Sequence, residues 1–230
     1  MNVTRRNFII GGAASVVGLS CAPMLNACGA SKTKSGINPK DFECAGTKTL
    51  GNGLENTYTA DVPIKLYTLT NSKGAELCIT NFGARIVSLM VPDKDNKLRD
   101  MVIGFDNIKG YATADTMPLN FFGAMVGRYG NRIANGKFSI DGKNYQVDIN
   151  ENDNSLHGGK FGFHFQTYKE VEVTNNKLVL ELVSPDGDMG FPGEFTLRVT
   201  YTLNDENIVG IYFESNTTAP TASTILNHAF

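Results

Sequence analysis

Apolar and polar residues alternate in short runs along the chain from residue 62 onward. Residues 64–69 and 75–80 form one pair of such runs, and residues 71–74 between them are turn formers. Alternation with a period of two places the apolar side chains on one face of a strand. The pattern therefore predicts an antiparallel hairpin here, followed by another strand over residues 84–91.

Three more hairpins are predicted by the same combination of alternation and turn residues. The pairs of runs are residues 137–140 with 143–149, 171–173 with 178–183, and 195–203 with 208–214. The first pair flanks Asp141-Gly142, a strong two-residue turn signal. No segment of helical length keeps an apolar period of 3.6 residues, although residues 106–116 could hold one helical turn. The predicted class is therefore all-β, as a large antiparallel β-sandwich.

The N-terminal segment has the composition of an export signal. Residues 1–27 contain Arg5-Arg6, which resembles a twin-arginine motif, and an apolar stretch too short to cross a bilayer as a helix. Leu25-Asn26-Ala27-Cys28 resembles a bacterial lipobox, with Cys28 as the lipidated first residue of the mature protein. The alternative is an ordinary signal peptide with an incidental cysteine. We expect an exported bacterial protein, either periplasmic or anchored to a membrane as a lipoprotein.

The composition changes again between this signal and the alternating region. Residues 28–60 are rich in small and polar residues, so they are predicted to form a tether and lead-in, and residues 61–230 are predicted to form the sandwich domain.

The net charge of −2, without a basic stripe, argues against nucleic acid as a partner. Cys44 and Cys78 could form a disulfide, or Cys78 could be a buried free thiol. No Cys/His spacing indicates a metal site.

Histidine carries the most specific chemical signal, because its unperturbed pKa lies nearest neutrality. His157 lies in a turn between Leu156 and two glycines, which expose the ring and allow unusual backbone angles. His228 follows the end of a predicted strand. Either histidine could instead be a satisfied structural group, and His164, which has aromatic neighbours, is predicted to pack. Two such sites in a β-rich chain indicate acid–base chemistry.

Two loops add polar groups. Residues 127–133 place Asn131 and Arg132 beside glycines, and their directed donors suit neutral hydroxyls as well as anions. The alternative is a solvated turn with surface arginines. Residues 184–193 are dense in turn residues and are predicted to form a rigid turn that shapes a pocket wall, since their spacing does not match a calcium-binding EF-hand.

In order along the chain, these segments resemble the aldose 1-epimerase (galactose mutarotase) family over residues 62–230. The matching segments are residues 81–93, 127–133, 154–159, 184–193, 199–201 and 226–228. The resemblance implies a β-sandwich with an open carbohydrate cleft that interconverts the α and β anomers of free aldohexoses, such as glucose or galactose. It implies no cofactor and no metal, and a monomer or dimer. It also implies His228 as the general acid, His157 as a histidine that hydrogen-bonds the sugar, and Asn131 and Arg132 as a sugar-binding pair.

The chain departs from the family pattern in two respects. Family members are longer, and their glutamate base and a sugar-binding aspartate come from a C-terminal segment that follows the position of Phe230. We therefore expect the N-terminal two-thirds of a family member, truncated at the C-terminus and with little or no activity alone. Tyr168 also stands where the family often has tryptophan. The competing hypothesis is a non-catalytic carbohydrate-binding domain on the same fold.

Overall fold

The computed structural model describes residues 32–113 and 119–230. The predicted export signal and Cys28 lie outside the described residues. Within the two described ranges, no helix combines the length and the apolar character needed to cross a membrane.

Strands form most of the regular structure. They are β1 (Leu66–Thr70), β2 (Glu76–Thr80), β3 (Arg85–Pro92), β4 (Leu98–Asp100), β5 (Met125–Val126), β6 (Arg132–Ile133), β7 (Lys137–Ile140), β8 (Lys143–Gln146), β9 (Ser155–Leu156), β10 (Lys169–Val173), β11 (Lys177–Ser184), β12 (Phe195–Leu203), β13 (Val209–Thr217) and β14 (Leu226–Asn227). The helices are short. They are α1 (Ile108–Ala112) and 3-10 helices at Pro39–Phe42, Thr47–Thr49, Leu54–Asn56, Leu119–Phe121, Ala134–Gly136, Phe163–Phe165 and Asp188–Gly190. The helical turn predicted within residues 106–116 corresponds to α1.

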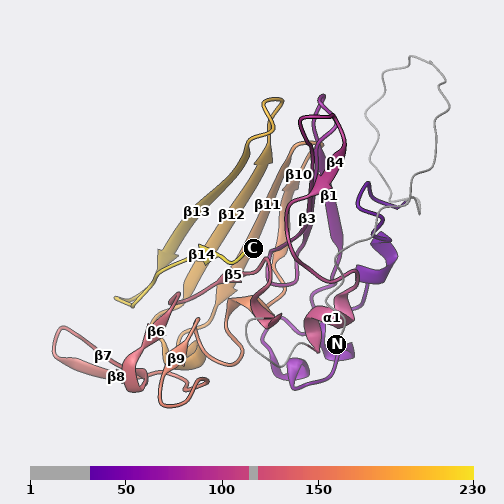
Figure 1. Cartoon of the computed structure of the whole chain (residues 1–230). Helices are drawn as coiled ribbons and strands as arrows, with labels where there is room; N and C mark the ends of the chain where they lie inside the picture. The colour runs from indigo at the N-terminus through magenta and orange to yellow at the C-terminus, as the bar shows by residue number, and fades with distance from the viewer. Residues whose placement is uncertain (1–31, 114–118) are drawn as a thin grey trace.

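Two four-stranded antiparallel sheets form the body of the molecule, in the orders β1-β2-β3-β4 and β10-β11-β12-β13 (Figure 1). The four predicted hairpins are all present, as β1–β2, β7–β8, β10–β11 and β12–β13. Asp141 and Gly142 have φ values of 51° and 79° between β7 and β8, as a hairpin turn with two left-handed residues requires. The predicted all-β class and antiparallel pairing are confirmed.

A shared apolar core packs the two sheets face to face. Leu69 of the first sheet and Leu180 and Leu197 of the second belong to one buried cluster, and each is completely buried. The Tyr201 hydroxyl donates a 2.5 Å hydrogen bond to the carbonyl of Ala84 from the opposite layer. The architecture is therefore a β-sandwich, and burial alternates along β12, where every second residue faces the core.

Residues 32–60, from the segment predicted to be a tether and lead-in, are folded against the first sheet. Phe42 and Leu54 are buried in a second apolar cluster with Val87 of β3 and Tyr111 of α1. The rings of Phe42 and Tyr111 lie 6.2 Å apart between centroids. The packed structure therefore begins before residue 61. The apolar residues of this segment are irregularly spaced, so no periodic pattern marks them as part of the core.

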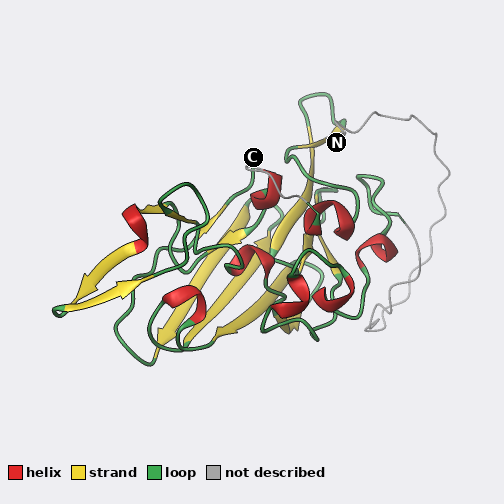
Figure 2. Ribbon diagram, turned by 90° about the horizontal axis from the view of Figure 1, so that it is seen from below, coloured by secondary structure: helices red, strands yellow, loops and turns green. Residues whose placement is uncertain are grey.

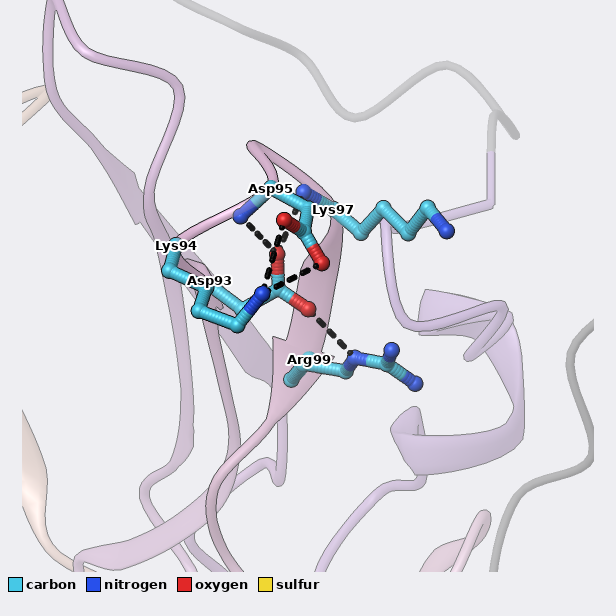
Figure 3. A network of polar contacts seen from close by, with 5 residues as sticks. All are labelled: Asp93, Lys94, Asp95, Lys97 and Arg99. Atoms are coloured by element: carbon cyan, nitrogen blue, oxygen red, sulfur yellow. Dashed lines mark hydrogen bonds and ion pairs between the residues drawn. The ribbon is translucent and has the colours of Figure 1, made fainter.

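The turn between β3 and β4 is held together by one carboxylate (Figure 3). Asp93 accepts hydrogen bonds from the backbone N–H groups of Asp95 and Lys97, both at 2.9 Å, and from Nε of Arg99 at 3.0 Å. The Lys97 hydrogen bond and the Arg99 side chain hold the pKa of Asp93 below its ordinary value. The local hydrogen bonds thus explain how a turn of charged residues stays ordered in solvent.

Three two-stranded ladders extend from the sandwich: β14–β5, β6–β9 and β7–β8. The β7–β8 hairpin projects beside β6 and β9 in Figure 1, and Figure 2 shows short helices and loops gathered over one end of the long strands. The first two ladders carry the residues predicted to bind sugar and move protons.

Candidate active site

The turn that contains His157 is hydrogen-bonded to the loop before β6. Arg132 pairs with Leu156 in the β6–β9 ladder, and His157 follows directly. The backbone N–H of His157 donates to the carbonyl of Asn131 at 3.0 Å, and the N–H of Asn131 donates to Nδ1 of His157 at 3.0 Å. Because Nδ1 accepts a hydrogen bond, the neutral ring carries its proton on Nε2. The histidine therefore presents an N–H donor on its free side.

Glycine is required immediately after His157. Gly158 has φ +88°, and a Cβ built there would lie 1.8 Å from the carbonyl oxygen of Gly127. The turn thus approaches the neighbouring backbone more closely than any side chain allows. His157 itself has φ 55°, a left-handed conformation that non-glycine residues adopt uncommonly. The unusual backbone conformation at His157 and Gly158 therefore sets the orientation of the His157 ring.

His228 lies beside His157, although 71 positions separate the two residues in the sequence. The β14–β5 ladder positions it, and its backbone N–H donates to the carbonyl of Ala124 at 2.8 Å. The His157 and His228 ring centroids are 5.0 Å apart at 89°. The Phe121 ring packs against both histidines as an aromatic floor, with its centroid 4.6 Å from that of His157 and 5.6 Å from that of His228. The structure therefore gathers two half-buried imidazoles on one apolar surface.

Arg132 and Asn131 border this histidine pair. Arg132 donates through Nε to Glu151 at 2.8 Å and through Nη2 to the other carboxylate oxygen at 2.5 Å. Its Nη1 lies 3.4 Å from Oδ1 of Asn131. The structure thus brings together all four residues predicted for the site: Asn131, Arg132, His157 and His228.

Burial and neighbouring charge lower the pKa of both histidines. Burial, followed by the charge of His228 and that of Arg132, lowers the pKa of His157 to about 4, while Glu151 acts in the opposite direction. Burial also lowers the pKa of His228, and the charge of Arg85 contributes to this shift. A neutral imidazole can donate a hydrogen bond to an uncharged hydroxyl, whereas a low pKa makes its protonated form a stronger acid.

Arg128 has a structural role, contrary to the interpretation of residues 127–133 as a solvated turn with surface arginines. It is 1% exposed, and its guanidinium donates to the carbonyls of Pro185 (2.7 Å), Pro192 (2.9 Å) and Gly193 (2.6 Å). It also donates to Oγ of Ser184 at 2.8 Å. The oxygens of residues 184–193 therefore surround the buried guanidinium of Arg128. These hydrogen bonds make the loop a rigid support.

The remaining histidine and the cysteines lie outside the polar part of the site. His164 is 1% exposed and packs 4.6 Å from Phe121 and 4.4 Å from Phe165, which confirms the prediction that it packs. Cys44 and Cys78 are not joined in a disulfide, and Cys78 is buried. Within residues 32–113 and 119–230, no group of three or more His, Cys, Asp or Glu side chains is arranged to hold a metal ion.

Comparison with known proteins identifies the family. The model of the aldose 1-epimerase family matches residues 65–230, which is most of the chain. The chain belongs to the aldose 1-epimerase family. It is 39% identical to galactose mutarotase of Rattus norvegicus over 152 residues, covering 66% of this chain and 43% of the rat protein. It is 32% identical to aldose 1-epimerase of Escherichia coli K12 over 168 residues, covering 73% and 47% of the two chains.

Solved structures of other aldose 1-epimerase family members share the fold. The GalM/aldose epimerase homologue from C. elegans matches with a TM-score of 0.67 and 32% identity, over 72% of this chain and 50% of that one. Galactose 1-epimerase from Lactobacillus acidophilus matches with a TM-score of 0.64 and 24% identity, over 75% and 50%, and supports the fold alone. The chain spans less than half the length of the two curated aldose 1-epimerase relatives described above.

Two residues of this candidate site were not predicted from the sequence. Phe121 precedes the matched segment at residues 127–133 and has no local motif, so only the tertiary structure reveals it as the floor under the histidines. Glu151 lies in a turn of Asn and Asp residues six positions before His157, and this turn composition was the available signal. Its pairing with Arg132 depends on the β6–β9 register, which no local sequence pattern predicts.

Proposed function

We propose that this protein interconverts the α and β anomers of free aldohexoses, as the names of its curated relatives indicate for those proteins. The observation that carries the proposal is the adjacent pair of imidazoles, His157 and His228, beside the hydrogen-bonding groups of Asn131 and Arg132. Mutarotation of a neutral sugar needs proton transfer at two oxygens, and histidine suits this role at neutral pH.

In the proposed reaction, the imidazolium form of His228 protonates the ring oxygen and becomes neutral, while a base removes the proton of the C1 hydroxyl. The bond between C1 and the ring oxygen breaks, and a C1 carbonyl forms. Rotation about the bond between C1 and C2 presents the other carbonyl face, and the reverse proton transfers close the ring as the opposite anomer. The family resemblance implies a glutamate as the base. We assign this step to none of the glutamates in the described residues.

The other residues bind and orient the sugar in this proposal. The neutral ring of His157 donates from Nε2 to an oxygen near the reacting centre, because Nδ1 is already engaged by the Asn131 backbone. Arg132 and the Asn131 amide donate to ring hydroxyls. These contacts position the sugar so that its ring oxygen faces His228, which converts proton transfer into a step between fixed partners.

Polarimetry of freshly dissolved α-D-galactose or α-D-glucose tests the proposal. The protein expressed from its complete reading frame is expected to accelerate the change in optical rotation, and His228→Ala is expected to abolish the acceleration. A thermal melt of the variant, unchanged within a few degrees, excludes unfolding as the cause. An undiminished rate in His228→Ala would refute the assigned acid. Sugar binding without any acceleration by the wild type would support the competing carbohydrate-binding function.

We also propose that the protein is an exported lipoprotein, anchored only through an acyl chain on Cys28, and a monomer or dimer. The support is the twin-arginine-like and lipobox-like sequence of residues 1–28. Metabolic labelling with an alkyne fatty acid in a bacterial host is expected to mark the wild type and to leave Cys28→Ser unlabelled. Cys21→Ser is the matched control, and labelling that follows Cys21 instead would refute the assignment.

A further inference from the structure

The carboxylate of Glu151 is the anchored partner of its ion pair with Arg132. The Glu151 side chain is 15% exposed, whereas that of Arg132 is 51% exposed. Glu151 and Asn154 pair through their backbones, with N–H to carbonyl distances of 3.1 and 2.8 Å. The Glu151 carboxylate therefore belongs to a turn that is fixed by backbone hydrogen bonds, whereas the Arg132 side chain that binds it is half exposed.

The same turn is locked to the strand that leads into His157. The side chain of Asn150 donates to the carbonyl of Leu156 at 2.9 Å and accepts from its N–H at 2.7 Å. Leu156 pairs in turn with Arg132 across the β6–β9 ladder. The backbone of residues 150–157 thus fixes both the Glu151 carboxylate and the His157 ring relative to Arg132.

We propose that Glu151 is a positioning residue, which holds the Arg132 guanidinium, and with it the Asn131 amide, in the orientation that binds sugar hydroxyls. This inference rests on the proposed function. Two parallel N–H to oxygen contacts fix the plane of the guanidinium, whereas a single contact would leave it free to rotate. The remaining Nη1 donor is directed toward Oδ1 of Asn131. One carboxylate thereby orients two groups that would contact the substrate.

Glu151 is poorly suited to act as the general base of the reaction. Its hydrogen bond with Arg132 is the main cause that lowers the pKa of its carboxyl below the ordinary value. A carboxylate that is stabilised by a two-point arginine pair is a weak proton acceptor, and its oxygens are occupied. The geometry therefore separates orientation by Glu151 from proton transfer at the histidines.

A second consequence is electrostatic. Arg132 lowers the pKa of His157 and Glu151 raises it, so the pair presents opposed charges to the imidazole. Removing the carboxylate leaves the guanidinium charge uncompensated beside His157. A variant that lacks this charge therefore changes the environment of His157 as well as the order of Arg132.

Glu151→Gln is the test variant, and Glu181→Gln is its matched control. Glu181 pairs with Arg198 across β11 and β12 of the second sheet, where Nε and Nη2 contact one carboxylate oxygen at 3.2 and 2.7 Å. In mutarotation assays of the protein from its complete reading frame, Glu151→Gln is expected to raise KM for galactose about tenfold while kcat changes less than about threefold. The control is expected to change neither. Equal KM values in Glu151→Gln and the wild type would overturn the inference.

A measurement without sugar separates this inference from the proposed function. In ¹⁵N NMR spectra of the wild type, the Nε–H signal of Arg132 is expected to be sharp, with slow hydrogen exchange with water. In Glu151→Gln the same signal is expected to broaden and its hydrogen to exchange faster. The Arg198 signal should show the corresponding loss only in Glu181→Gln. An unchanged Arg132 signal overturns the positioning role even if the protein acts on no sugar. A large drop in the melting temperature of Glu151→Gln, together with a fall in kcat as large as the rise in KM, would also overturn the positioning role. Such a result would show that Glu151 is needed for the fold.

Discussion

At the scale of single residues, the properties of His157 follow from its hydrogen bonds and not from its residue type alone. Its Nδ1 accepts from the Asn131 backbone, which disfavours an imidazolium form with a proton on the same atom. The sequence predicted which residues approach one another, because the family resemblance covers Asn131, Arg132, His157 and His228. It could not predict Phe121 or the partner of Arg132, since these contacts depend on tertiary packing and strand register.

We expect His157 to remain neutral from pH 7 to pH 5, with its proton on Nε2. The pKa of about 4 in the folded state lies below the ordinary value of 6.5. The unfolded chain therefore binds the proton first on acidification, and this residue's contribution to stability is present above about pH 6.5 and is lost as the pH falls toward 4. Ring ¹⁵N chemical shifts in a pH titration measure this directly. A titration midpoint near 6.5 would contradict the described environment.

At the scale of elements, local patterns predicted the hairpins well, whereas the site-bearing ladders were too short to predict. The Asp141-Gly142 turn and the alternation on both sides define β7 and β8 without tertiary information. The strands β6 and β9 have two residues each, and their pairing depends on the close approach of Gly158 to the Gly127 backbone. In the sequence, the glycine itself is the only sign of such a close backbone contact.

Two glycine-to-alanine substitutions are expected to differ sharply in cost. Gly158→Ala would place Cβ 1.8 Å from the Gly127 carbonyl oxygen, so we expect it to destabilise the fold by about 3 kcal/mol or more through displaced backbone. Gly142→Ala has a similar positive φ but open space around Cβ, and should cost about 1 kcal/mol. Urea denaturation measures both. Equal losses would show that the close approach at Gly158 is not a determinant of the fold.

At the scale of the whole molecule, the sandwich is extended by a segment outside the matched family region. Residues 32–60 contribute Phe42 and Leu54 to the cluster beside the first sheet, although their composition resembled a tether. Their 3-10 helices have no periodic apolar pattern, because each supplies one or two buried residues to an existing surface. The composition of this segment therefore gives no sign of these two buried residues.

Removing one of these anchors tests how much the segment matters. Phe42→Ala deletes a fully buried ring and is expected to cost about 3–5 kcal/mol of unfolding free energy. Ile208→Ala, at a position 59% exposed, is the control and should change stability by less than about 0.5 kcal/mol. A loss at Phe42 as small as the control would show that residues 32–60 are dispensable to the core.

We propose that the His157–His228 site exchanges sugar anomers, and NMR saturation transfer on equilibrated galactose measures this exchange directly. The protein from its complete reading frame is expected to transfer saturation from the α-anomer H1 signal to the β-anomer H1 signal. His228→Ala, with an unchanged melting temperature, is expected to show only the slow uncatalysed exchange. Anomer exchange in His228→Ala as fast as in the wild type, or no exchange in either, would contradict the account.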